Sequence, residues 1–152
     1  CANPLARGRC EPARVGTTIS MTLSLRTPAD PASLTGMRAR LTRWLADVGV
    51  PHDVAFGVIA ACSEAVSNAI EHTVDPREPF VDIDGERHGD VLTLQVRDYG
   101  QWRTPRLGTD RNHGLLLIDS LVDEVDIDRS EEGTTVTMRL DLAGAAAARR
   151  SA

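Results

Sequence analysis

A long segment in the middle of the chain constrains the fold most, because its apolar residues recur at helical spacing. The segment starts at His52 or Asp53 and ends near Thr73. At 100° per residue one face gathers apolar side chains and the opposite face gathers polar ones. The apolar set is Phe56, Ile59, Cys62, Val66 and Ile70, and the polar set is Glu64, Asn68, Glu71 and His72. Such a helix is stabilised when its apolar face packs on another layer, so the sequence predicts a helix that covers a sheet.

Patterns on either side of this segment predict the remaining elements. Alternation of apolar and polar residues is typical of strands with one buried face, and strands are predicted over 17–26, 80–84, 91–97, 124–128 and 134–142. Helices are predicted over 32–48 and 114–122, and loops over 75–79 and 98–112. The order β-α-α-β-β-loop-α-β-β pairs strands as hairpins and groups the helices, which favours a two-layer α+β sandwich over a doubly wound parallel sheet.

The length of 152 residues suits one domain. We expect a flexible lead-in over 1–16, the domain over 17–142, and a fraying Ala- and Arg-rich tail over 143–152. Because the first residue is Cys1 and not Met, we expect the chain to be a segment of a longer protein. No apolar stretch approaches the roughly 18–20 residues of a membrane span, and no signal peptide is visible, which predicts no association with a membrane.

The charged residues exclude several classes of function. The net charge of −5 argues against non-specific binding of nucleic acid. All 17 basic residues are Arg, so the chain lacks the Lys that a Walker A loop and a eukaryotic-type protein kinase place on the phosphates. Cys1, Cys10 and Cys62 form neither a disulfide framework nor a metal cluster. Cys62 is predicted to be a small buried residue, and a reduced, cytoplasmic setting is expected.

The polar face of the long helix carries the strongest chemical signal. Glu64 and Asn68 are four residues apart and therefore stack one turn apart. The Asn oxygen can ligate Mg²⁺, and the Glu carboxylate can accept a proton from an attacking hydroxyl. The alternative is a solvated polar face, but Asn is a poor residue inside a helix, and its neighbours Ala60, Ala61 and Ser67 are small enough for a pocket wall.

The run Glu64-Ala-Val-Ser-Asn68-Ala-Ile-Glu-His72 resembles the N-box of the GHKL ATPases. It is most similar to the version in bacterial anti-sigma-factor serine kinases of the RsbW and SpoIIAB type, and the resemblance extends from about Thr18 to Leu142. It implies the Bergerat fold, with a mixed, mostly antiparallel sheet and helices on one face. It also implies a site for ATP and Mg²⁺, with Asn68 as the metal ligand. His72 belongs to this nucleotide-binding motif, although its position at a helix end is also favoured by the helix dipole alone.

Three later motifs follow in the order expected of this family. Asp98-Tyr-Gly100 resembles the D-x-G box, in which the Asp binds the adenine amino group and the Gly lets the backbone approach the base. Asn112-His113-Gly114-Leu115 resembles the box that closes the ATP lid, where N–H groups at a helix start hold phosphates. Gly133-Thr134-Thr-Val resembles the final strand start, whose Thr hydroxyl supports the adenine-binding Asp. A turn beside a strand is the alternative interpretation of the first and third motifs.

The predicted lid departs from the common pattern at two places. Asn112 replaces a glycine, although Asn tolerates positive φ better than most residues. The run Gln101-Trp-Arg103-Thr-Pro105 resembles a D-x-G-x-W-R-x-P variant of actinobacterial members. Arg103, with Arg106 and Arg111, either offers positive charge near the phosphates or forms a solvated rim.

The resemblance implies a serine kinase and anti-sigma factor that phosphorylates a STAS-type anti-anti-sigma partner to regulate transcription. In that interpretation Glu64 is the catalytic base, and Arg38 matches a family arginine that contacts the partner. Relatives are typically homodimers, and a sigma factor is a further partner. One alternative is a non-catalytic, ATP-dependent module that sequesters a sigma factor or its antagonist, which the altered residue Asn112 favours. A histidine-kinase-type catalytic domain is a second alternative, and a gyrase- or MutL-like ATPase is disfavoured because no transducer domain follows.

Overall fold

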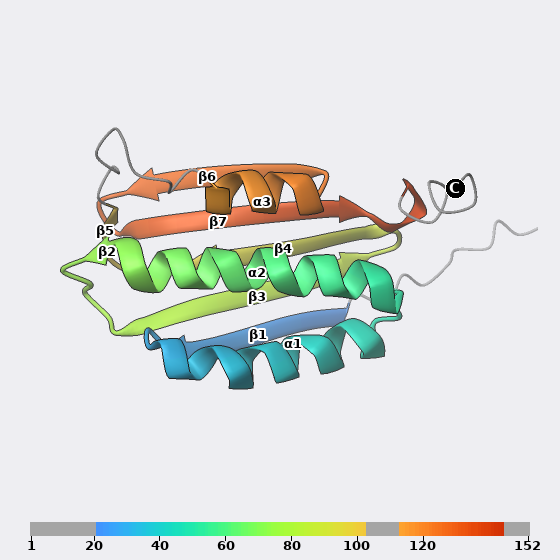
Figure 1. Cartoon of the computed structure of the whole chain (residues 1–152), viewed down its shortest axis with the longest axis horizontal. Helices are drawn as coiled ribbons and strands as arrows, with labels where there is room; N and C mark the ends of the chain where they lie inside the picture. The colour runs from blue at the N-terminus through green and yellow to red at the C-terminus, as the bar shows by residue number, and fades with distance from the viewer. Residues whose placement is uncertain (1–20, 103–112, 145–152) are drawn as a thin grey trace, which may run out of the picture.

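The computed structural model describes residues 21–102 and 113–144 (Figure 1). The structure contains helices and strands in an order that agrees with the sequence prediction. In chain order they are β1 (Met21–Pro28), a 3-10 turn η1 (Pro31–Ser33), α1 (Leu34–Asp47), α2 (His52–His72), β2 (Thr73–Val74), β3 (Phe80–His88), β4 (Val91–Arg97), β5 (Gln101–Trp102), α3 (His113–Leu121), β6 (Glu124–Ser130) and β7 (Gly133–Asp141).

The five longer strands form one sheet in the order β1-β3-β4-β7-β6. All four pairings between them are antiparallel, so this sheet is not mixed, in contrast to the mixed sheet expected. The helices α1, α2 and α3 lie side by side over one face of the sheet (Figure 1). The predicted two-layer α+β sandwich is therefore confirmed.

Two local predictions are wrong. Strand β3 continues to His88 and does not end at residue 84, because Gly85 lies inside the strand and the turn comes at Gly89, where φ is +60°. A short second sheet joins β2 to β5, with Thr73 opposite Trp102; β2 lies where the long helix was predicted to end, and β5 lies inside the loop predicted over 98–112. Strands of 2 residues are too short to show a period. The predicted lead-in 1–16, the start of the first strand at 17–20 and the tail from 145 onward lie outside the described residues.

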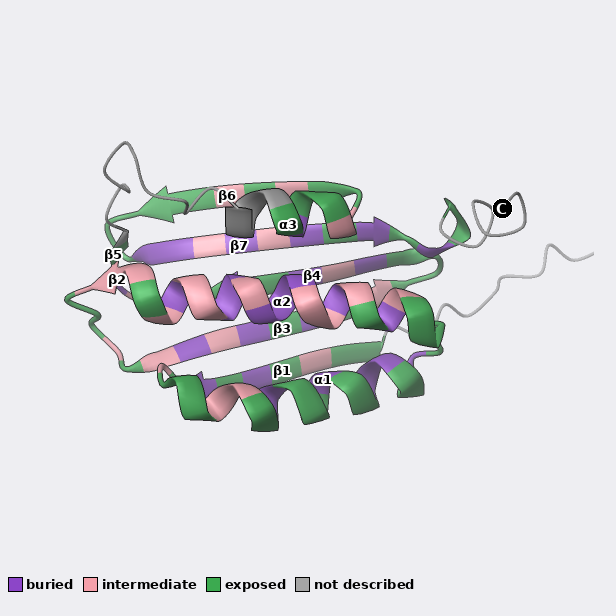
Figure 2. Cartoon of the chain, in the orientation of Figure 1, coloured by how far each residue is buried: buried purple, intermediate pink, exposed green. Residues whose placement is uncertain are grey.

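The core forms where α2 packs on the sheet. The face of α2 that is buried consists mostly of small residues, namely Ala55, Val58, Ala61, Cys62, Ala65, Val66 and Ala69 (Figure 2). This face is rotated from the predicted one, since Phe56 is 73% exposed. Full burial raises the pKa of the Cys62 thiol to about 12, so Cys62 acts as a small apolar residue, as predicted.

Helix α2 is long and apolar enough to cross a membrane by length and composition alone, with a mean hydropathy of 1.3. The expectation that no segment approaches this threshold is therefore wrong. Buried core helices meet the same criterion, and α2 lies between α1 and α3 over the sheet (Figure 1). Its apolar character follows from this central position in the fold.

The sheet face opposite the helices carries a cluster of polar and aromatic side chains. Arg26, Asp82 and Arg97 stand opposite one another on β1, β3 and β4. Arg26 donates from Nε to Asp82 Oδ1 at 2.7 Å and from Nη2 to Asp82 Oδ2 at 2.8 Å. The hydroxyl of Tyr99 also donates to Asp82 Oδ2. We call Arg26, Asp82, Arg97 and Tyr99 the outer-face cluster.

Hydrogen bonds fix the protonation of this cluster at neutral pH. The bond from Arg26 holds the pKa of Asp82 below its ordinary value, and the bond to Asp82 raises the pKa of the Tyr99 phenol. Asp82 is therefore an acceptor and Tyr99 a donor. The Tyr99 ring also packs against two guanidinium groups, with Cζ of Arg97 at 5.1 Å and Cζ of Arg26 at 5.6 Å from its centroid.

Two glycines allow a matched test of the packing of α1 on the sheet. A Cβ at Gly85 would lie 2.8 Å from Trp44 Cη2, whereas a Cβ at Gly36 would meet nothing within 4 Å. We expect Gly85→Ala to lower the free energy of unfolding by about 1–3 kcal/mol, because the buried indole has to shift. Gly36→Ala should raise it by roughly 0.4–1 kcal/mol through helix propensity and a stiffer unfolded chain. Urea unfolding measures both, and equal destabilisation by the two changes would contradict this packing.

The outer-face cluster predicts a pH dependence of stability. Because the pKa of Asp82 is lowered on folding, its contribution is fully present above the unfolded value of about 3.9 and is lost as the pH falls through the folded value. The stability difference between the wild type and Asp82→Asn should therefore be largest above about pH 5 and shrink at lower pH. Asp84→Asn, on the same strand and face, is the control, because the structure records no hydrogen bond to the Asp84 carboxylate among the described residues. A constant difference for Asp82→Asn from pH 6 to pH 3 would contradict the assignment.

Candidate functional site

Glu64 and Asn68 lie one turn apart on α2, and both are half-buried. They follow Gly57 by seven and eleven positions, so the three residues form one stripe along the helix. At Gly57 this stripe faces α3, since a Cβ there would lie 3.8 Å from Leu121. The acid and the amide therefore line the α3 side of α2, away from its apolar face. No hydrogen bond to the Asn68 amide is recorded in the described part of the chain, so its oxygen can accept a ligand.

The end of β4 holds Asp98 in a fixed and buried position. Asp98 is 4% exposed, and its backbone N–H donates to the carbonyl of Thr134 at 3.0 Å. Its Oδ1 accepts the N–H of Gly100 at 3.1 Å and the N–H of Thr134 at 3.2 Å. The structure records no bond to Oδ2 from the described residues. A carboxylate oxygen that the described residues leave open suits an amino group of a ligand.

The support from Thr134 differs in detail from the family expectation. The direct contact with Asp98 comes from the backbone N–H of Thr134, and the side chain of this residue is almost fully buried. Gly133 allows the approach: its φ is +145°, and a Cβ there would lie 2.0 Å from the carbonyl oxygen of Asp98. Only glycine fits this position without moving the Asp98 backbone.

Gly100 performs a packing role that the sequence prediction did not include. A Cβ at Gly100 would lie 2.2 Å from Thr73 Cγ2 and 2.9 Å from the carbonyl oxygen of Val74. The missing side chain of Gly100 therefore makes room for the backbone that leaves α2. The role that the family resemblance implies for this glycine is different, namely to let the backbone approach the adenine base. The hydroxyl of Thr73 is buried and has no hydrogen-bond partner among the described residues. A buried hydroxyl in this state suits a nearby polar ligand.

Helix α3 brings its first turn to the same end of the molecule. It runs antiparallel to α2, so its start lies toward the C-terminal end of α2 (Figure 1). His113, Gly114 and Leu115 form this first turn, as the lid motif requires if N–H groups at a helix start hold phosphates. His72 is the last residue of α2 and is half-buried. Arg103 and Asn112 lie outside the described residues.

A groove of about 360 Å³ borders Glu64 on the outer side of α2. It lies between α1 and α2 and is lined by Arg38, Phe56, Ile59, Ala60, Ser63, Glu64 and Ser67. Arg38 Nε donates to Ser63 Oγ at 2.9 Å, and this hydroxyl donates to the carbonyl of Ile59 at 2.6 Å. Arg38 is therefore anchored to α2 beside Glu64 while the residue itself stays exposed.

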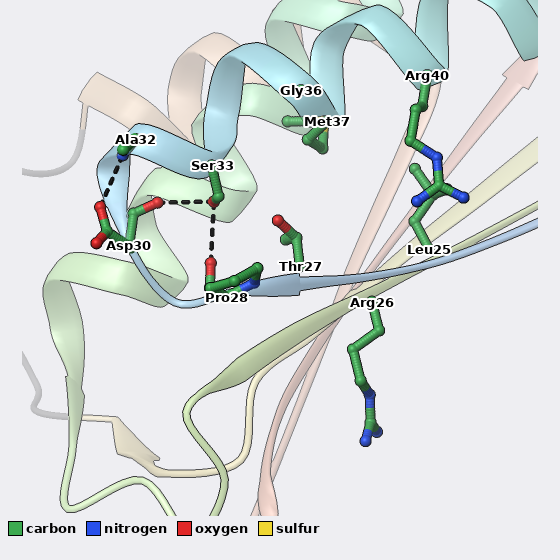
Figure 3. Close-up of a pocket in the computed structure, with 10 residues that line it drawn as sticks. All are labelled: Leu25, Arg26, Thr27, Pro28, Asp30, Ala32, Ser33, Gly36, Met37 and Arg40. Atoms are coloured by element: carbon green, nitrogen blue, oxygen red, sulfur yellow. Dashed lines mark hydrogen bonds between the residues drawn. The ribbon is translucent and has the colours of Figure 1, made fainter.

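Two further grooves lie elsewhere. A groove of about 410 Å³ borders Thr134 and is lined also by Gln101 and residues 129–131. A groove of about 480 Å³ lies between β1 and α1 and contains none of the predicted site residues. Figure 3 shows that Arg26 points to the opposite side of β1 from Leu25, Thr27 and α1. The guanidinium of Arg26 therefore belongs to the outer-face cluster and not to the β1–α1 groove.

Asp98, Gly100 and Thr134 meet where β4 ends and β7 begins, and β5, just after Gly100, pairs with β2, which follows His72 at the end of α2. Glu64 and Asn68 lie further back along α2, and the first turn of α3 lies toward the C-terminal end of that helix (Figure 1). Arg38 lies beside Glu64 on the neighbouring helix. Sequence reasoning did not identify Thr73, Ser63 or the outer-face cluster. Only the packing of residues far apart in the chain assigns them a role, so no local pattern marks them.

Comparison with known proteins identifies the family. The model of the histidine kinase-like ATPase domain matches residues 27–140. The crystal structure of the RsbU and RsbW domains of Rv1364c from Mycobacterium tuberculosis is similar, with 27% identity and a TM-score of 0.66. The match covers 80% of this chain and 32% of that one, so the chain spans about a third of that protein.

Two more distant structures share the fold. The blue-light activated histidine kinase EL346 of Erythrobacter litoralis has 24% identity and a TM-score of 0.53, covering 64% of this chain and 33% of that one. The SiaB-SiaC complex of Pseudomonas aeruginosa has 13% identity and a TM-score of 0.53, covering 78% of this chain and 88% of that one. Because the family model covers most of the described domain, this chain belongs to the histidine kinase-like ATPase domain family, the GHKL superfamily that its motifs resemble.

Proposed function

We propose that this domain is an ATP-dependent protein serine kinase that phosphorylates a STAS-type anti-anti-sigma protein in the cytoplasm and thereby regulates transcription. The observation that supports the proposal most is the shared stripe of Glu64 and Asn68 on α2, the helix that leads into β2 and so to the strand pair beside the buried Asp98. Family membership implies ATP binding. The similarity to a structure that contains an RsbW domain favours a kinase of the anti-sigma type.

The adenine of ATP would be recognised by Asp98. Its Oδ1 is engaged by two backbone N–H groups, so Oδ2 remains to accept a hydrogen bond from the exocyclic amine. A base that lacks this donor would forgo the hydrogen bond to Oδ2, which costs binding energy. Asp98 would therefore select adenine, with Gly100 and Thr134 keeping its orientation.

The phosphates would lie between α2 and the start of α3. Asn68 is the proposed ligand of Mg²⁺, which when bound neutralises charge on the phosphate oxygens. His113, Gly114 and Leu115 would offer N–H groups of the first helical turn to the phosphates. We also assign His72, Asn112 and Arg103 to this region on the basis of the family motifs.

Glu64 would act as the general base in phosphoryl transfer. It would accept the proton of the target serine while the serine oxygen forms a bond to the γ-phosphorus. The bond from that phosphorus to the β–γ bridging oxygen breaks, and ADP leaves. Glu64 suits this role because it is half-buried on the nucleotide side of α2 and also borders an open groove, through which a protein segment can reach it.

The groove beside Glu64 is the proposed docking site for the partner protein. The exposed ring of Phe56 offers an apolar surface, and Arg38 offers a positive charge anchored on Ser63. A partner segment with an apolar side chain and a carboxylate beside its serine would match both. The other function that the motifs allow is a module that binds ATP and sequesters a partner without transfer, and a transfer assay separates the two.

Nucleotide binding tests the site itself. We expect isothermal titration to show binding of Mg-ATP that is weakened at least about tenfold by Asp98→Asn, which replaces an acceptor oxygen with a donor. Asn68→Ala should weaken the binding of ATP much more with Mg²⁺ present than with Mg²⁺ removed by chelation. Gln95→Ala, an exposed change on the outer face of β4, is the control. Unchanged affinity in both site variants would sink the proposed nucleotide site.

Phosphoryl transfer tests the role of Glu64. With labelled ATP and candidate STAS proteins, Glu64→Gln should reduce formation of phosphoserine about 100-fold or more and leave ATP affinity within about twofold, since general-base catalysis contributes about 10²–10⁴. Glu71→Gln, an exposed carboxylate on the same helix, should change neither quantity. Nucleotide binding by the wild type without any phosphoserine would support the sequestering module, and acid-labile phosphate on a histidine would support a histidine kinase.

A further inference from the structure

The residue between Asp98 and Gly100 connects the nucleotide end of the sandwich to the opposite face of the sheet. Side chains alternate along a strand, and the buried Leu92, Leu94 and Val96 of β4 precede Asp98 on the helix side. Tyr99 points the other way and joins the outer-face cluster through its hydroxyl. One peptide unit therefore separates the bonded Tyr99 side chain from the carboxylate that would recognise adenine.

On the helix side, the carboxylate of Asp98 is held by two hydrogen bonds to one of its oxygens. Its Oδ1 accepts two N–H groups at 3.1 and 3.2 Å, at the long end of the ordinary range for such bonds. Both donors are backbone groups, one in Gly100 itself and one in Thr134, the second residue of β7. The described residues donate no hydrogen bond to Oδ2, so the orientation of the carboxylate also depends on the backbone at Asp98, which continues directly into Tyr99.

Three groups of Tyr99 make contacts that hold this residue, namely its hydroxyl, its carbonyl oxygen and its ring. Its hydroxyl donates to Asp82 and accepts from Arg26 Nη2 at 3.1 Å. Its carbonyl oxygen accepts the N–H of Arg77 at 2.8 Å. Its ring packs against the guanidinium groups of Arg26 and Arg97. These partners come from β1, β3, β4 and the loop before β3, so the position of Tyr99 is fixed relative to the sheet.

The carboxylate of Asp82 is the centre of this arrangement. Arg26 binds both of its oxygens, and Arg26 also contacts Glu78 at 3.2 Å and the ring of Phe80 at 5.6 Å. A bidentate pair of this kind restricts orientation more than a single contact does. Because the side chain of Arg26 is 51% exposed, the pair contributes little to stability relative to its effect on geometry.

We propose that Tyr99 is a positioning residue for base recognition: bound to the Asp82–Arg26 pair on the outer face of the sheet, it fixes the orientation in which Asp98 accepts the adenine amino group. The role rests on the proposed recognition of adenine by Asp98. It makes the outer-face cluster a determinant of nucleotide selectivity, although no member of the cluster touches the nucleotide.

Two nucleotides that differ only in the exocyclic amine test this role. We expect Tyr99→Phe to weaken the binding of Mg-ATP about three- to tenfold, the value of one misaligned hydrogen bond. The affinity for the triphosphate of purine riboside, which lacks the amine, should stay unchanged. Asp82→Asn should have the same effect, and the double variant should add little to either single change, because both act through one bond. Asp84→Asn, on the same strand and face as Asp82, is the matched control and should leave both affinities unchanged.

The outcomes separate a positioning role from a structural one and from failure of the site. The proposal would be overturned if Tyr99→Phe and Asp82→Asn weakened the binding of both nucleotides equally. It would also be overturned if neither change weakened the binding of ATP. Additive effects in the double variant would also overturn it. If Asp98→Asn itself leaves ATP affinity unchanged, the proposed nucleotide site fails. If Asp98→Asn weakens the binding of ATP and Tyr99→Phe does not, only the positioning role fails. Urea unfolding of each variant confirms that the titrated protein is folded.

Discussion

The packing of α2 on the sheet is the interaction on which the rest of the structure depends. Its buried face consists largely of Ala, Val and Cys, so the helix axis can approach the sheet closely. The strands below it supply larger apolar side chains, such as Ile83, Leu92 and Met138, which fill the space that the small helix residues leave. This contact also sets the rotation of α2. With one face buried, the stripe that contains Glu64 and Asn68 lies at the side of the helix, toward α3.

Family motifs far apart in the chain meet at one end of the sandwich because of the strand topology. Strand β4 ends where β7 begins, since the two pair antiparallel with Arg97 opposite Thr135. Asp98 and Thr134 follow as direct neighbours, and Gly133 permits their close contact. The C-terminal end of α2 continues into β2, which pairs with β5 just after Gly100. The motifs at Asp98–Gly100 and at Gly133–Thr134 therefore lie at the ends of strands, and the pairing of those strands brings the two motifs together.

Periodic patterns predicted the elements and the layer order, because burial of one face is what creates a period. These patterns were less reliable where a residue has the spacing of a buried position but is exposed in the fold, or the reverse. Phe56 has the spacing of a core residue but is 73% exposed, because the helix is rotated by its small residues toward the sheet. Gly85 is a residue type typical of turns, but it lies within β3, where Trp44 of α1 occupies the space of its missing side chain. Thr73 and Tyr99 gain their roles only from residues distant in sequence, so a single sequence could not have assigned them.

The two faces of the sheet separate two tasks that conflict when they share one surface. Groups that bind a nucleotide have to keep donors and acceptors open for it, the role proposed for the second oxygen of Asp98, and such groups cannot also be held by many protein contacts. A strand solves this conflict by alternation: the residue next to Asp98 points to the other face, where Arg26 and Asp82 can bind it fully. The exposure of the Arg26 side chain limits what the pair adds to stability, and in the proposed role the dense bonding around Tyr99 also orients Asp98.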